Sequence, residues 1–169
     1  MTKESFIKEL NFKIDEELCY DEISNAANSV WISTVATEND GFEFIRDKSN
    51  SNFFVGKLHR FPKTLLEIQN QNIEFNLEKS YITKCNPGYI STLHINKGRT
   101  SAIIIPIGRN KGEIIFKPAN DIEYRHTYTG PTLTKVDVPH GPINTSDSIR
   151  YSITLDIPGN YTENYNKKW

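Results

Sequence analysis

The sequence has little of what secreted and membrane proteins carry. Its two cysteines, Cys19 and Cys85, lie far apart and belong to no CxxC or CxH pattern, which argues against a disulfide framework and against a zinc ribbon. The first twelve residues, MTKESFIKELNF, contain no long apolar run, and no later stretch has the length of a membrane span. We therefore expect reduced thiols, no membrane association and a cytoplasmic location.

A surplus of either charge is also missing. Lys and Arg number 20 against 21 Asp and Glu, a formal net charge of -1, so there is no general electrostatic case for nucleic-acid binding. The phosphate-binding patterns GxGxxG and GxxxxGK followed by Ser or Thr are absent, and so is the GxSxG nucleophile elbow. The sequence therefore contains no motif that indicates nucleotide-dependent activity.

What is present is enough apolar material for one packed domain. The chain has 169 residues, of which 37% are hydrophobic and 24% charged, with no internal repeat and no linker-like stretch. We interpret 1–169 as a single domain with three sections: an N-terminal support region (1–72), a β-rich core (73–157) and a C-terminal tail (158–169).

The N-terminal section contains two helix patterns and one strand pattern. Residues 14–28 carry early acidic residues and a rough apolar stripe, and residues 62 to about 71 begin with proline, which fits the first helical position. Between them, 30–36 (VWISTVA) is typical of a strand. The polar stretch 37–52 predicts a loop or hairpin with its tip near Asp40-Gly41.

From residue 73 onward, short β-type runs recur about every ten residues, separated by turn residues such as Asn86-Pro87-Gly88. No helix pattern interrupts these runs, which excludes a doubly wound parallel sheet and predicts an antiparallel sandwich or barrel. The expected strands are 73–77, 79–85, 89–95, 101–107, 112–118, 122–128, 132–138 and 150–157.

A small set of polar residues in or next to these runs are candidates for a catalytic or ligand-binding site. Strand alternation puts His94 and Asn96 on one face, and His140 follows a later strand, within a Pro-His-Gly-Pro turn. Arg150 and Ser152 share a face of the last strand. An arginine that points into a barrel must find an anion, because an unpaired buried guanidinium is too costly to desolvate. A dicarboxylate ligand would satisfy it.

In this order and spacing, the residues resemble the signature of the Fe(II)- and 2-oxoglutarate-dependent oxygenases. That signature is a histidine, any residue and a carboxylate, then a second histidine, then Arg-x-Ser. The segment VPHGPINTSDSIRYSITLDI and the preceding Asn-Pro-Gly turn are most similar to the aspartyl/asparaginyl β-hydroxylase-like branch, whose small phage-encoded members have a similar size. The match covers about residues 81–157.

The resemblance implies a mainly β fold, a double-stranded β-helix (a cupin-like jelly-roll) preceded by a few N-terminal helices. It implies that His94 and His140 bind Fe(II), with Asn96 at the third ligand position. Arg150, with Ser152 beside it, would bind 2-oxoglutarate. The implied activity is that of a dioxygenase, a hydroxylase that releases succinate and CO₂ and acts on a small-molecule or peptide substrate that the sequence does not identify.

Asn96 is the departure from the family pattern, because a neutral amide stands where a carboxylate is usual. The chain would then bind iron through two histidines and water, hold a halide at the vacated position, or lack catalysis. We favour the first interpretation because His140, Arg150 and Ser152 are all present. The competing hypothesis is a catalytically inactive jelly-roll binding module.

Several residues also have purely structural interpretations. Arg150 could form a surface pair with Asp137 or Asp156. Tyr81 and Tyr89 could hydrogen-bond 2-oxoglutarate or serve only as core or rim aromatics. Arg99 could reach a substrate carboxylate or phosphate, or lie in a solvated turn. Asn144 is expected to organise the turn before the last strand.

Overall fold

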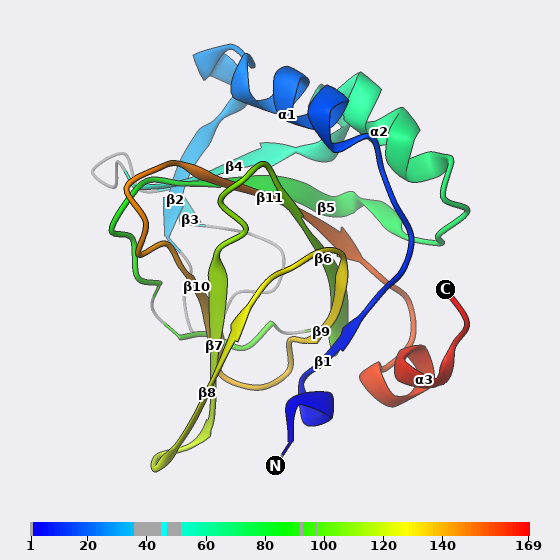
Figure 1. Ribbon diagram of the computed structural model, residues 1–169, viewed down its shortest axis with the longest axis vertical. Helices are drawn as coiled ribbons and strands as arrows, with labels where there is room; N and C mark the ends of the chain where they lie inside the picture. Colours follow the sequence, from blue (N-terminus) through cyan, green and yellow to red (C-terminus); the bar gives the residue numbers. More distant parts are fainter. Residues whose placement is uncertain (1, 36–44, 47–51, 92, 97) are drawn as a thin grey trace.

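The computed structural model describes residues 2–35, 45–46, 52–91, 93–96 and 98–169, and strands dominate it (Figure 1). Within these residues the strands form two antiparallel sheets. The large sheet contains, in spatial order, β1 (Ile7–Glu9), β9 (Thr132–Lys135), β6 (Ser101–Ile107), β11 (Arg150–Asp156), β5 (Asn76–Cys85), β4 (Phe53–Lys57), β2 (Ile32–Val35) and β3 (Ile45–Arg46). The small sheet contains β10 (His140–Ile143), β7 (Glu113–Ala119) and β8 (Ile122–Thr127).

The chain crosses repeatedly between the sheets. After β5 it passes to the small sheet, where single bridges join Ile90 to Ile143 and His94 to His140 of β10. It returns to the large sheet for β6, crosses for β7 and β8, and continues through β9, β10 and β11 in alternation. This alternation is the jelly-roll topology that cupins share, so the predicted mainly β jelly-roll is confirmed.

The N-terminal region extends the large sheet at both edges, because β1 pairs with β9 and β4 pairs with β5. Two helices, α1 (Glu16–Ser24) and α2 (Pro62–Gln69), pack on the outer face of this sheet (Figure 1). Single 3-10 turns occupy Lys3–Ser5, Asn28–Val30 and Leu58–Arg60, and a short helix, α3 (Tyr161–Asn166), lies in the segment interpreted as a tail. In the described part of the chain, no helix is long and apolar enough to cross a bilayer.

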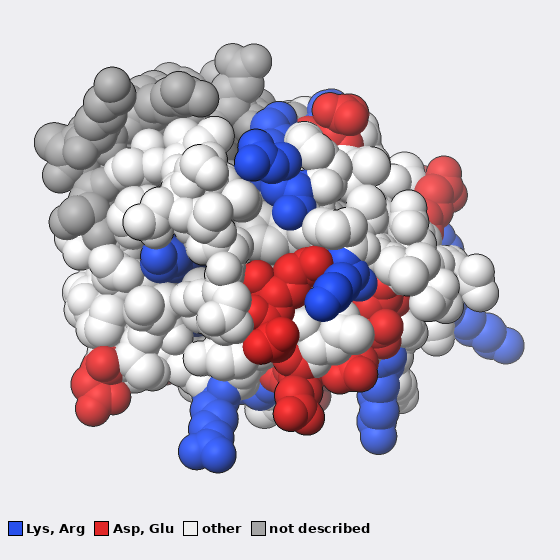
Figure 2. Space-filling view, turned by 90° about the horizontal axis from the view of Figure 1, so that it is seen from above, with Lys and Arg blue, Asp and Glu red and all other residues white. Residues whose placement is uncertain are grey.

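Acidic side chains fasten α1 to its surroundings. Figure 2 shows acidic residues gathered on the face that is seen from above Figure 1, the side on which α1 and α2 lie. Glu22 accepts the backbone N–H groups of Lys63 (2.9 Å) and Thr64 (2.8 Å) at the start of α2, where the free amides need acceptors. Glu16 pairs with Lys111 and accepts the N–H of Gly108 at 3.0 Å. These carboxylates therefore have structural partners.

Strand β11 is buried on both of its faces, and the two faces differ. Ile153 and Leu155 point outward into the apolar cluster under the helices. Arg150, Ser152 and Thr154 point inward, into the space between the two sheets. The period of two in a strand thus separates an apolar core from a polar interior.

Some boundaries differ from the sequence-based expectations. The runs 73–77 and 79–85 contribute to one strand, β5, which begins at Asn76. The run 89–95 was expected to be a strand, but its described residues form only the two bridges, because Pro87 and Gly88 turn the chain just before it and Gly98 just after it. The Pro-His-Gly-Pro segment, expected to be a turn, forms β10 against β7. The expected loop or hairpin at 37–52 lies almost entirely outside the described residues.

We predict that Ile153→Ala lowers the free energy of unfolding by about 2–5 kcal/mol, because it opens a cavity where the side chain is fully buried between the sheet and the helices. Ile122→Ala, at an exposed position of the edge strand β8, is the matched control and should change stability by less than about 0.5 kcal/mol. Urea unfolding of the two variants measures the difference. Equal losses would show that the outer face of β11 is not the main core.

Candidate functional site

A cavity lies between the inner face of the large sheet and the small sheet. The cavity has a volume of about 60 Å³, several times the roughly 10–15 Å³ that one water molecule needs. Its size suits a small ligand or a few waters. The polar residues that line it are Tyr81, Thr83, Ser91, His94, Asn96, Arg99, Tyr128, His140, Arg150, Ser152 and Thr154.

The two candidate metal-binding histidines lie directly opposite each other. The backbone N–H of His94 donates to the carbonyl of His140 at 2.9 Å, and the reverse bond measures 3.0 Å. Residues paired in this way project their side chains to the same side. The imidazole centroids are accordingly 4.5 Å apart, and both rings line the cavity.

The ring of His140 is held in one tautomer. Its Nδ1 lies 2.7 Å from the carbonyl oxygen of Val138, which can only accept, so Nδ1 carries the proton and Nε2 is left with a lone pair. Burial, together with the neighbouring His94, lowers the pKa of His140 to about 3. His140 is therefore neutral at physiological pH, the form that ligates metals.

Asn96 lies beside His94, and its amide orientation is fixed by Arg99. A guanidinium has only donors, so the amide oxygen faces it and accepts from Nε at 3.0 Å and from Nη2 at 2.6 Å. The amide nitrogen then faces Nε2 of His94 at 3.3 Å. In this arrangement the oxygen of Asn96 is already engaged, and its role as a metal ligand stays a prediction.

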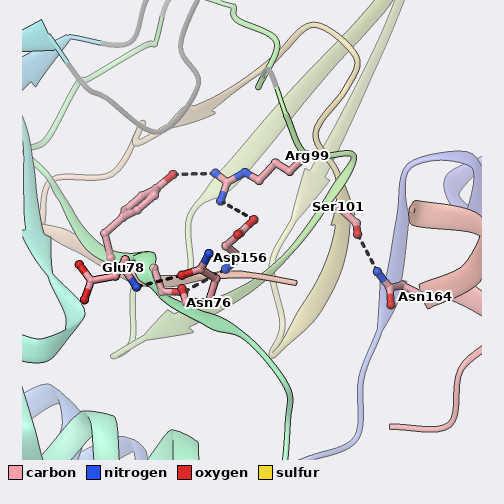
Figure 3. Close-up of polar contacts among 8 residues, drawn as sticks. Asn76, Glu78, Arg99, Ser101, Asp156 and Asn164 are labelled. Carbon is pink, nitrogen blue, oxygen red and sulfur yellow. Dashed lines mark hydrogen bonds and ion pairs between the residues drawn. The ribbon is translucent and has the colours of Figure 1, made fainter. Parts of the chain in front are cut away.

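Arg99 is buried rather than solvated in a turn, with 7% of its surface exposed. Figure 3 shows its guanidinium directed toward Asp156, and their closest N–O distance is 3.7 Å. Nη2 also donates to the hydroxyl of Tyr81 at 3.2 Å. Burial raises the pKa of Asp156, and Arg99 opposes that rise. Arg99 and Asp156 thus offset each other's charge inside the fold.

Arg150 lies at another part of the cavity wall and is 2% exposed. Its Nε donates to the carbonyl of Lys111 at 3.3 Å, and its guanidinium lies 5.4 Å from the centre of the Tyr128 ring. Among the described residues, Nη1 has no hydrogen-bond partner. A buried cationic donor without an acceptor is costly, so this atom marks a place for an anion.

The surface pairings considered for Arg150 are wrong. Asp137 pairs with Lys135 at 2.8 Å, and Asp156 pairs with Arg99. Instead, the turn after β6 closes over the guanidinium. Gly112 has a positive φ of 74°, and a Cβ there would lie 2.0 Å from Nε of Arg150. Only glycine lets this backbone lie so close.

The remaining predicted residues differ in their positions. Ser152 lines the cavity, and its hydroxyl lies 2.6 Å from that of Thr83. Tyr81 also lines the cavity, whereas Tyr89 is not among the described lining residues and stacks on Phe53 with the ring centroids 5.2 Å apart. Asn144 organises the turn before β11, since its amide donates to the carbonyls of Cys85 and Ser148.

Sequence reasoning missed Thr83 and Tyr128 and did not foresee the burial of Arg99. No local pattern marks these residues, because strands far apart in the sequence bring them together. Among the described residues, no group of three or more His, Cys, Asp or Glu side chains is placed to hold a metal ion. Two imidazoles are the strongest metal-binding feature of the cavity.

No family model and no curated protein match the chain. Among solved structures, 21 chains show significant similarity. One is the cupin_2 domain of an XRE-family transcriptional regulator from Enterobacter cloacae, with 14% sequence identity and a TM-score of 0.35 over 53% of this chain and 87% of that one. A similarity this distant does not say what the present chain binds.

We predict that acid destabilises the metal-free protein through His140. The unfolded histidine titrates near 6.5 and the folded one near 3, so between these values the unfolded state binds a proton that the folded state does not. Stability should therefore fall as pH drops through this window, by up to about 1.4 kcal/mol per pH unit from this group. The stability of the His140→Asn variant, whose amide keeps a donor for the carbonyl of Val138, should fall less steeply as the pH drops. Denaturant midpoints across pH measure both slopes, and identical slopes would refute the assignment.

Proposed function

We propose that this chain is an Fe(II)- and 2-oxoglutarate-dependent dioxygenase that hydroxylates a small-molecule or peptide substrate. His94 and His140 would hold the iron, and Arg150, with Ser152 beside it, would hold the far carboxylate of 2-oxoglutarate. One observation carries the proposal: a jelly-roll cavity brings a pair of facing imidazoles and a buried guanidinium together from three separate segments.

The histidines fit a divalent iron. Imidazole is a ligand that iron accepts, and His140 is already neutral, with the proton on Nδ1 and the lone pair on Nε2. Asn96, at the expected third ligand position, does not fit iron in the same way, because its amide oxygen faces Arg99. We therefore propose a two-histidine site completed by water or 2-oxoglutarate.

The charges of the cavity favour a bound anion. Arg99 is offset by Asp156, whereas Arg150 has no carboxylate within ion-pair distance among the described residues. A carboxylate placed on Nη1 of Arg150 would satisfy that donor with a charge-assisted hydrogen bond. Tyr128 packs on the guanidinium, and the Gly112 turn covers it, so its position is set before the ligand arrives. When bound, iron with 2-oxoglutarate and O₂ would supply the oxidising power for hydroxylating a C–H bond: one oxygen atom of O₂ would enter the product and the other succinate, with CO₂ released.

The second candidate function is a metal-free binding module that uses the same cavity for a small anionic ligand. The contacts of Asn96 favour it, because the pocket contains a neutral amide where a metal site usually has a carboxylate. In that case Arg150 would still bind a carboxylate, but neither iron nor turnover would be involved.

An anaerobic titration separates the two functions. We expect ferrous iron and 2-oxoglutarate together to produce a visible charge-transfer band, and succinate to form once oxygen is admitted. Binding of 2-oxoglutarate without iron, with no band and no succinate, would support the binding module and contradict the dioxygenase.

Substitutions should separate metal binding from carboxylate binding. His140→Ala should weaken iron binding by more than the roughly 10–100-fold that loss of an outer-shell partner costs. Arg150→Gln should leave iron affinity nearly unchanged but weaken 2-oxoglutarate by roughly 10–100-fold, the value of a charge-assisted bond. His126→Asn, at a buried histidine of β8 that does not line the cavity, is the matched control. Calorimetry under argon measures each affinity, and equal iron binding by His140→Ala would show that the ligand assignment is wrong.

A further inference from the structure

Asn96 lies where the oxygenase signature has a metal-binding carboxylate, and its hydrogen bonds indicate a role other than metal binding. Arg99 presents two donors to the amide, from Nε and Nη2, at 3.0 and 2.6 Å. Because a guanidinium accepts no hydrogen bond, the oxygen of Asn96 has to face it. The amide nitrogen is thereby turned to Nε2 of His94, 3.3 Å away.

This contact determines what His94 presents in the metal-free protein. The amide nitrogen can only donate, so Nε2 of His94 must accept and cannot carry a proton. The lone pair that a metal would need is already used by Asn96.

The charge balance of the pocket agrees with an amide at this position. Arg99 already has Asp156 as its partner, at 3.7 Å and with both side chains largely buried. A carboxylate at position 96 would bring a second negative charge close to Arg99, which already faces the carboxylate of Asp156 in this buried group. The neutral amide accepts from Arg99 without that cost.

We infer that Asn96 is a positioning residue that caps His94, and that it is not an iron ligand. Arg99 locks the amide, and the amide holds the imidazole of His94 through Nε2. The amide would have to turn away before that nitrogen could bind iron. This inference rests on the proposed function for its iron-binding part, whereas the cap exists in the metal-free protein.

The cap is tested first without metal, by ¹⁵N NMR of the histidine side chains. We expect His94 to carry its proton on Nδ1, with an Nε2 resonance shifted by an accepted hydrogen bond. Asn96→Ser, whose side chain is too short to reach, should move that Nε2 resonance toward the value of a free lone pair. A protonated Nε2 in the parent, or an unchanged resonance in the variant, would overturn the inference.

Iron affinity is tested second, by anaerobic titration with ferrous iron alone. Removing a hydrogen bond of about 1 kcal/mol that competes with the metal should tighten binding about fivefold in Asn96→Ser. If Asn96 were a ligand, the same variant would bind iron more weakly, which contradicts the inference. Asn164→Ser is the matched control, since this buried asparagine bonds to Ser101 and Pro158 and is outside the cavity lining.

Arg99→Lys provides a second variant, because it keeps the positive charge near Asp156 and removes the two-donor fork that locks the amide. Iron binding should tighten in the same direction as in Asn96→Ser, and weaker binding would again contradict the inference. If no protein binds iron while the NMR signature of the cap is present, the cap stands and the dioxygenase proposal fails. The two failures are therefore distinguishable.

Discussion

The structure depends on one strand that is buried on both of its faces. β11 runs through the middle of the large sheet, between β5 and β6, and each of its seven residues is buried. Ile153 and Leu155 join the apolar core beneath the helices, whereas Arg150 and Ser152 face the cavity. A shift of one residue in its register would put a guanidinium into the apolar core and isoleucine into the cavity, so the fold and the site are specified together.

Burying arginines in a domain of this size requires partners for them. Arg99 has Asp156, the hydroxyl of Tyr81 and the amide of Asn96. Arg150 has the carbonyl of Lys111 and the ring of Tyr128, and the polar network around Asn144 fixes the turn that precedes it. One cation is therefore internally compensated and the other is not. This asymmetry, together with neutral His140, is the physical basis for expecting an anionic ligand at one particular place in the cavity.

Much of this arrangement could be predicted from the sequence, because it follows from strand periodicity. Alternation in the last strand places Arg150 and Ser152 on one face, and short β runs without helices between them indicate an antiparallel fold. Other features could not be read locally. Residues 89–95 look like a strand but form two bridges, and 140–143 look like a turn but form β10, because tertiary pairing overrides local preference. The orientation of Asn96 depends on Arg99, and the burial of Arg99 depends on Asp156, nearly sixty residues further along the chain.

The central claim is that His94, His140 and Arg150 form one site for a metal and a carboxylate. The most direct measurement is an anomalous difference map at the iron absorption edge, from crystals prepared anaerobically with ferrous iron and 2-oxoglutarate. The account predicts one peak between the two imidazoles and density for a carboxylate on the guanidinium of Arg150. A peak elsewhere, or no peak with the carboxylate bound at a different place, would contradict it.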